Sequence, residues 1–126
     1  MWKVEHEPTE ALLLVCLRGS PSQAELVELA QAHDHGISAT GGATFRVLLD
    51  LRGLRPLVAE LVGHLERIKR TAASVPGCAR IAVLVDSATV AMQQNRTRVA
   101  GPERELVTLD EAEARRFLEE PPRAAG

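Results

Sequence analysis

Two aspartates stand at the ends of apolar segments, where an α/β fold usually places its functional groups. Asp50 closes the segment 45–50, and Asp86 follows the segment 80–85. If both segments are parallel strands, the two carboxylates come to the same edge of a sheet. There they could form a general acid–base pair or hold a divalent cation. Helix capping and turn stabilisation use the same residue type at the same places, and we favour this second interpretation.

Arginines accompany these acidic residues. Arg52 and Arg55 follow Asp50 closely, and either can form an ion pair with an aspartate at that edge. Another group, formed by Arg96, Arg98 and Arg104, surrounds the end of a predicted helix. Such a group can contact a partner or an anion, although a solvated helix face is the favoured interpretation.

Other residue types that could do chemistry give weaker patterns. The histidines of the segment 33–35 are separated by one residue, so on a helix they point in different directions and predict no metal site. Gly41 and Gly42 lack the Lys and Ser or Thr that follow a phosphate-binding loop. No metal or other cofactor is therefore expected.

Composition narrows the function classes. The chain has 126 residues, of which 45% are hydrophobic and 25% charged, as is usual for one globular domain. A net charge of −2 gives no electrostatic signature for nucleic-acid binding. An aromatic content of 2% leaves few side chains on which nucleic-acid bases could stack. No apolar run reaches the roughly 20 residues that a membrane span needs.

The compartment is predicted from the N-terminus and the cysteines. The first seven residues do not resemble a secretory signal, because no apolar stretch follows a basic start. Cys16 lies in an apolar segment and Cys78 follows a Pro-Gly turn, and a disulfide between them is not expected in a reducing compartment. These features favour a cytoplasmic protein.

Hydrophobic periodicity predicts an α/β fold with a mixed, mainly parallel sheet of about five strands and four helices. Strands are expected at 1–5, 11–18, 45–50, 80–85 and 105–107, and helices at 21–35, 57–74, 87–98 and 109–120. The short gap between the first two strands predicts an antiparallel pair, and the three later crossovers should be right-handed. We expect one domain over residues 1–120 and a disordered tail over 121–126.

Helix-end signals set these boundaries. Ser20 with Gln23 predicts a capping box around Pro21, and Gly36 predicts the end of that helix. Asp86 or Ser87 should cap the third helix. A second capping box, Thr108 with Glu111, is expected before the last helix.

With this element order, the chain resembles the STAS-domain superfamily, in particular its SpoIIAA-like branch, which is also similar to the CRAL-TRIO lipid-transfer fold. The segments that carry the resemblance are 47–53, VLLDLRG, 80–88, RIAVLVDSA, and the last helix with its LDEA start and Phe117-Leu118. The resemblance covers nearly the whole chain. It rests on strand and turn patterns, not on a catalytic motif.

The chain departs from this family at one functional position. In the anti-sigma-factor antagonists of the family, a serine that opens the helix after the strand matching 45–50 is phosphorylated by a partner kinase. The corresponding segment here, 54–59, has the sequence LRPLVA and holds no Ser or Thr. The phosphorylation switch is therefore not expected, and Ser87 belongs to the next helix, where capping is its simplest role.

The resemblance and the lack of catalytic groups together predict a non-catalytic regulatory or protein-interaction module in a bacterial cytoplasm. The expected binding surface is formed by Asp50, Arg52, Gly53, Arg55, Leu57, Asp86, Ser87 and Val90. The alternative is a binder or carrier of a small hydrophobic ligand or lipid, as the CRAL-TRIO likeness implies. An enzyme that uses Asp50 and Asp86 is the third possibility and requires a carboxylate of raised pKa. The first strand could leave an open sheet edge and allow a homodimer.

Overall fold

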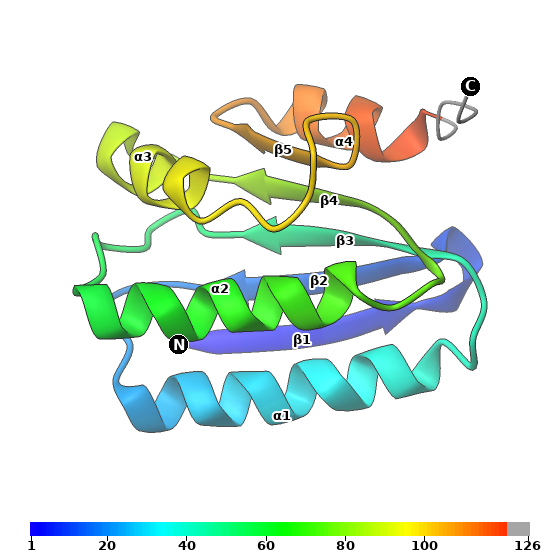
Figure 1. The fold of residues 1–126 in the computed structure, drawn as a ribbon, viewed down its shortest axis with the longest axis horizontal. Coiled ribbons are helices and arrows are strands. Elements are labelled where there is room, and N and C mark those ends of the chain that lie inside the picture. Colours follow the sequence, from blue (N-terminus) through cyan, green and yellow to red (C-terminus); the bar gives the residue numbers. More distant parts are fainter. Residues whose placement is uncertain (121–126) are drawn as a thin grey trace.

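The strands form one mixed sheet whose spatial order is the order in the sequence (Figure 1). A computed structural model describes residues 1–120, so the tail expected at 121–126 lies outside the described residues. The first strand runs antiparallel to the second, and every later neighbour pair is parallel. The strands are β1 (Trp2–Glu7), β2 (Leu12–Leu17), β3 (Phe45–Asp50), β4 (Cys78–Leu84) and β5 (Glu105–Thr108).

A short turn and three helices connect these strands, and a fourth helix follows the last of them. The predicted fold class is confirmed, because the described residues form an α/β structure with a mainly parallel five-stranded sheet and four helices. The 3-10 turn η1 (Pro8–Glu10) joins β1 to β2. The helices are α1 (Gln23–Ala39), α2 (Ala59–Ala73), α3 (Ala88–Arg96) and α4 (Glu111–Glu119).

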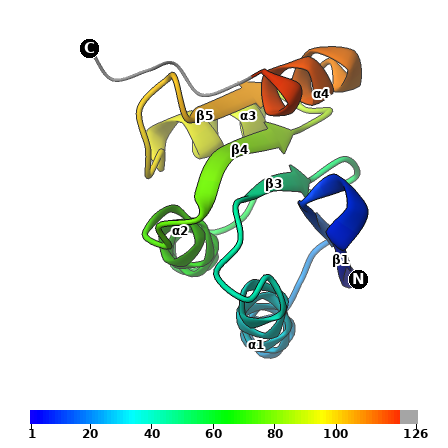
Figure 2. The same cartoon turned by 90° about the vertical axis from the view of Figure 1, so that its right-hand side faces the viewer.

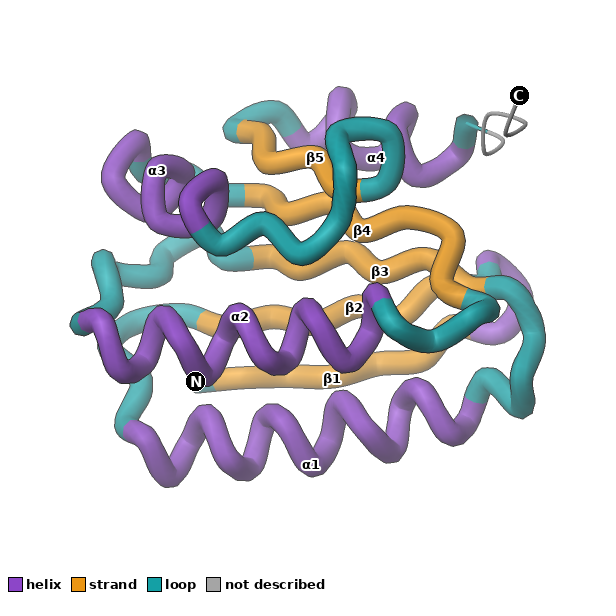
Figure 3. The backbone as a smooth tube through the Cα atoms, in the orientation of Figure 1, coloured by secondary structure: helices purple, strands orange, loops and turns teal. Residues whose placement is uncertain are grey.

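The helices cover the two faces of the sheet unequally. Crossovers that are right-handed and always advance to the next strand must fall on the same face. Accordingly α1, α2 and α3 lie on one face, and α4 lies alone on the other (Figures 2 and 3). α4 contacts β3, β4 and β5, whereas β1 and β2 are packed by α1.

Alternation along the strands divides the core in two. Leu13, Val15 and Leu17 of β2 point toward α1 and α2, together with alternate residues of β3 and β4. The smaller cluster on the other face joins Leu12 and Leu48 to Ala114 and Leu118, with other residues of β4 and α4.

Several predicted boundaries are wrong by a few residues. β1 continues to Glu7, which pairs with Leu12, so the predicted loop at 6–10 shortens to one turn. α1 is capped by Ser22, not Ser20: the Ser22 hydroxyl accepts a hydrogen bond from the Glu25 amide, and the Glu25 carboxylate accepts from the Ser22 amide. A carboxylate is a stronger acceptor than Gln23 would provide, and it also lies at the positive end of the helix.

Gly36 does not end α1 as predicted but lies inside it. The helix continues to Ala39, and Gly36 faces the sheet at the point of closest approach. A Cβ atom at this position would lie 2.6 Å from Leu13 Cδ1 and 3.3 Å from Val4 Cγ1. The glycine therefore allows α1 to lie close to β1 and β2.

The substitution Gly36→Ala is expected to destabilise the protein by about 1 kcal/mol or more, because overpacking outweighs the better helix propensity of alanine. The matched control is Gly63→Ala in α2, where the added Cβ meets no atom within 4 Å. That control should stabilise by about 0.5–1 kcal/mol. Chemical denaturation of both variants measures the difference, and equal shifts would contradict the packing role of Gly36.

α4 is capped by Asp110 at its N-terminus and bound by two arginines of the sheet near its C-terminus. The predicted capping box of Thr108 and Glu111 is wrong: Asp110 caps the helix by accepting from the Ala112 amide. Near the other end, the Arg46 guanidinium donates to the Leu118 carbonyl at 2.9 Å. Arg80 donates to the Phe117 carbonyl at 2.8 Å. These donors satisfy carbonyls that a helix terminus leaves without a partner.

Candidate functional site at the carboxyl edge of the sheet

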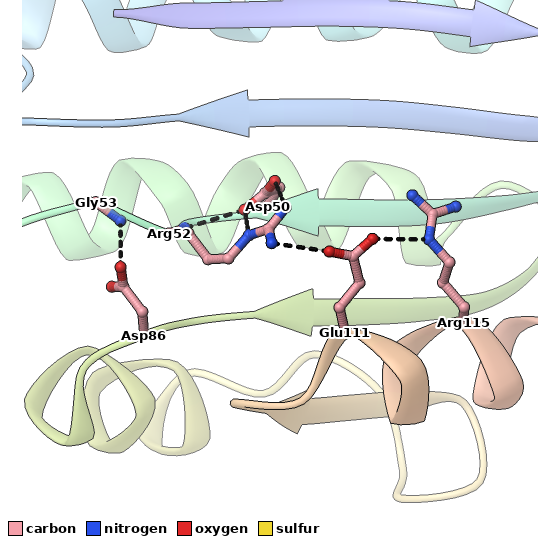
Figure 4. A network of polar contacts seen from close by, with 6 residues as sticks. All are labelled: Asp50, Arg52, Gly53, Asp86, Glu111 and Arg115. Carbon is pink, nitrogen blue, oxygen red and sulfur yellow. Dashed lines mark hydrogen bonds and ion pairs between the residues drawn. The ribbon is translucent and has the colours of Figure 1, made fainter.

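The carboxyl ends of β3 and β4 hold a network of polar side chains (Figure 4). Asp50 is the last residue of β3, and the guanidinium of Arg52 folds back onto it. Arg52 Nε donates to Asp50 Oδ1 at 3.0 Å and Nη2 donates to Oδ2 at 2.8 Å. The Arg52 amide also donates to Oδ1, at 3.1 Å. The buried Asp50 carboxylate is thus saturated by a single neighbouring residue.

The same arginine connects the edge of the sheet to α4. Its Nη1 donates to Glu111 Oε1 at 2.8 Å, and Glu111 Oε2 accepts from Arg115 Nε at 3.1 Å. The charges therefore alternate in sign from one bonded side chain to the next, from Asp50 through Arg52 and Glu111 to Arg115. Glu111 is drawn into this network and not into the predicted capping box.

Asp86 is used differently from Asp50. Its Oδ2 accepts from the backbone amide of Gly53 at 2.9 Å, so it fixes the turn that follows β3. Gly53 has a φ of +81°, a left-handed conformation that disfavours residues with a Cβ. Each aspartate thus has its own partner in the same turn, which agrees with the favoured interpretation of turn stabilisation.

The electrostatics of this edge favour ionised carboxylates. Burial alone would raise the pKa of Asp50, but the hydrogen bonds and charge of Arg52 outweigh it and hold the pKa below its ordinary value. Hydrogen bonds and charge from Arg115 and Arg52 likewise lower the pKa of Glu111. The general-acid interpretation of Asp50 requires a raised pKa, and the shift found is in the opposite direction.

The predicted site residues differ in accessibility. Gly53, Arg55 and Asp86 are exposed, and Arg52 and Ser87 are half-buried. Asp50, Leu57 and Val90 are buried, so their side chains pack inside the protein. Ser87 caps α3 as predicted, because its hydroxyl accepts from the Val90 amide at 3.3 Å. The sequence order brought these residues to one edge, but it did not indicate which of them face outward.

The same edge carries exposed apolar residues that were not predicted. Val58 immediately precedes α2, Met92 lies on α3, and Leu109 follows β5; they are 67%, 53% and 62% exposed. The Gln93 side chain bonds to both backbone groups of Leu57, which joins the segments that carry Val58 and Met92. The apolar character of these residues is visible in the sequence, but no binding role was predicted for them.

Two of the three candidate arginines near the end of α3 have structural roles, whereas Arg96 is exposed. Arg98 donates to the Glu105 carbonyl, and Arg104 donates to the carbonyls of Ala73 and Cys78. In residues 1–120 no group of three His, Cys, Asp or Glu side chains is placed to hold a metal ion. Cys16 and Cys78 carry free thiols.

The size of the internal space tests the alternative that the protein binds a hydrophobic ligand. A void beneath α1 and α2, lined by residues including His33, measures about 10 Å³, too little for a ligand. A larger space, of about 310 Å³, is an open groove between these two helices. No helix in the described part of the chain is both long and apolar enough to cross a membrane.

Comparison with known proteins adds no assignment. No protein-family model matches the chain, and no curated protein is similar to it. The STAS resemblance therefore stays a prediction that rests on the segments quoted above.

Proposed function

We propose that this protein is a non-catalytic protein-interaction module, of the regulatory kind that the STAS resemblance implies, and that it binds its partner through the carboxyl edge of the sheet. The observation that carries the proposal is that Val58, Met92 and Leu109 are exposed on three segments that follow the ends of β3, β4 and β5, while Asp50 and Asp86 are bonded internally. Apolar side chains with a polar surround are typical of protein contacts.

Val58 supports the proposal most directly. It is the N-cap residue of α2, with the extended backbone that a cap requires, yet its side chain makes no capping hydrogen bond. Asp, Ser or Thr would stabilise the helix at this position. A residue that breaks a local folding rule while lying 67% exposed fits a role in binding better than a role in stability.

The substitution Val58→Asp tests whether Val58 serves binding and not stability. The aspartate can cap α2, so the free energy of unfolding should rise by about 0.5–2 kcal/mol. At the same time, a charge replaces an apolar contact, and partner binding should be lost. Chemical denaturation measures the first effect. Native affinity purification from the source cells, followed by calorimetry with the purified partner, measures the second.

The matched control is Val27→Asp, at an exposed valine of α1, a helix that carries none of the three residues of the proposed surface. A specific partner should be retained by the wild type and by this control and lost from Val58→Asp. Because the edge variant is expected to be more stable, its loss of binding cannot be attributed to unfolding. A partner that binds Val58→Asp as tightly as the wild type, or that is lost only from the α1 variant, would refute the proposed surface.

A further inference from the structure

The groove between α1 and α2 is separate from the carboxyl edge and has features of a small-molecule site. The two helices lie side by side on one face of the sheet (Figures 1 and 2). The groove between them measures about 310 Å³, at the lower limit of the size of ligand pockets. Ala30 is one of the residues that line it, and its short side chain helps to leave the space open.

The groove combines an apolar floor with a polar wall. Leu26 and Ile68 form buried parts of the floor, and Val27, which is 44% exposed, lies beside them. His64 and Arg67, one turn apart on α2, form the polar wall. An apolar floor with a few convergent polar groups is the usual design of a small-molecule site.

Arg67 supplies a positive charge that the fold does not use. Its guanidinium has no hydrogen-bond or ion-pair partner among residues 1–120, and neither has the His64 side chain. The next arginine of α2, Arg70, is paired with Glu66 at 2.9 Å. The groove therefore offers a free cation and a free imidazole above an apolar surface, which is complementary to an anionic head on an apolar body.

The other charged group of the groove limits the charge of the ligand. Asp34 lies on α1 with its Oδ1 3.9 Å from His33 Nδ1. A dianion such as a phosphate monoester would be repelled by this carboxylate more than a monoanion would. A groove of this volume can cover only a short apolar body.

We propose that the α1–α2 groove binds a small monocarboxylate with an apolar body, whose carboxylate contacts Arg67 and His64 and whose body packs on Leu26, Ala30 and Ile68. This site does not depend on the protein-interaction surface, because it lies between the helices and not at the carboxyl edge. It also gives the hydrophobic-ligand alternative a definite place and ligand class.

The probe for this site is octanoate, titrated at about pH 7.5 into the isotope-labelled full chain while amide NMR shifts are recorded. Saturable shifts of α1 and α2 amides are expected, with a dissociation constant of about 1 mM or tighter for a ligand of this size. Octylamine carries the same apolar body with the opposite charge and should bind at least about tenfold more weakly.

Two variants decide whether the groove is responsible. Arg67→Glu should weaken octanoate binding at least about tenfold, and Ala30→Phe should abolish it by filling the groove. Arg116→Glu, at an exposed arginine on α4, is the control with the same charge change and should bind octanoate normally. The spectrum of each variant reports its folding, and Arg67→Glu alone decides if Ala30→Phe does not fold. No saturable shift in the groove, equal binding of octylamine, or full binding by Arg67→Glu would overturn the proposal.

Discussion

Replacing Glu105 with leucine is expected to lower the free energy of unfolding by about 3–5 kcal/mol, because the change removes one partner of a buried ion pair. Glu105 is 0% exposed and Lys69 is 2% exposed, and Glu105 Oε2 accepts from Lys69 Nζ at 2.9 Å. Glu105 Oε1 also accepts from the amides of Val99 and Ala100. Leucine would leave the lysine and both amides without acceptors. Denaturant unfolding at neutral pH measures the loss.

The double variant Lys69→Met with Glu105→Gln separates the charge from the shape of the site. Glutamine can still accept from the two amides, and methionine replaces the buried ammonium with an apolar chain of similar length. The double variant should therefore be more stable than the sum of the two single changes predicts, by at least about 1 kcal/mol of coupling. Additive single and double changes, or an unchanged unfolding midpoint for Glu105→Leu, would show that the pair does not matter for stability.

His33 is expected to make stability depend on pH in the mildly acidic range. His33 lies on α1 and its ring, which is 2% exposed, faces the sheet and α2. Burial lowers the pKa of the ring below 6.5, despite the opposing effect of Asp34. Between the lowered pKa and 6.5 the unfolded chain binds more protons than the folded one. The contribution of His33 to the free energy of unfolding should therefore be fully present above pH 6.5 and decrease as the pH falls below 6.5.

The variant His33→Leu isolates this contribution, since the other histidines remain in both proteins. The difference in the free energy of unfolding between wild type and variant should shift in favour of the variant as the pH is lowered from about 7.5 to about 5. Urea unfolding across this range provides the measurement. A difference that stays constant over the range would mean that His33 does not titrate between the two states.

Much of the fold could be predicted because its signals are local. Apolar runs bounded by Gly and Pro identified β2, β3 and β4, and the apolar stripe of α2 identified the best helix. The errors arose where tertiary contacts, and not local signals, determine the ends and caps of the helices. Gly36 has the residue type of a helix stop, yet its position against Leu13 makes it a packing residue. Thr108 and Glu111 have the spacing of a capping box, yet Arg52 binds the glutamate more strongly.

The sequence predicted where the candidate site lies, but it did not predict which of its side chains are exposed. Parallel strands bring Asp50 and Asp86 to one edge, and this follows from the order of the elements. An ion pair of Arg52 or Arg55 with an aspartate was expected, and Arg52 forms it with Asp50. No local pattern showed which arginine and which aspartate would pair, or that Val58 would lie outside the core. The ion pair of Lys69 with Glu105 was missed for the same reason, because the two residues lie far apart in the sequence, on α2 and β5.

The sequential order of the strands has a consequence for how the chain is assembled. Each strand pairs with the strand nearest to it in the sequence, so the sheet can grow from the N-terminus as the chain is synthesised, without waiting for distant segments. β5 is the last strand among residues 1–120, and it carries Glu105. A nascent chain that ends before β5 therefore holds Lys69 of α2 without its counter-charge, and the last strand to join the sheet also neutralises the lysine that earlier steps have begun to bury.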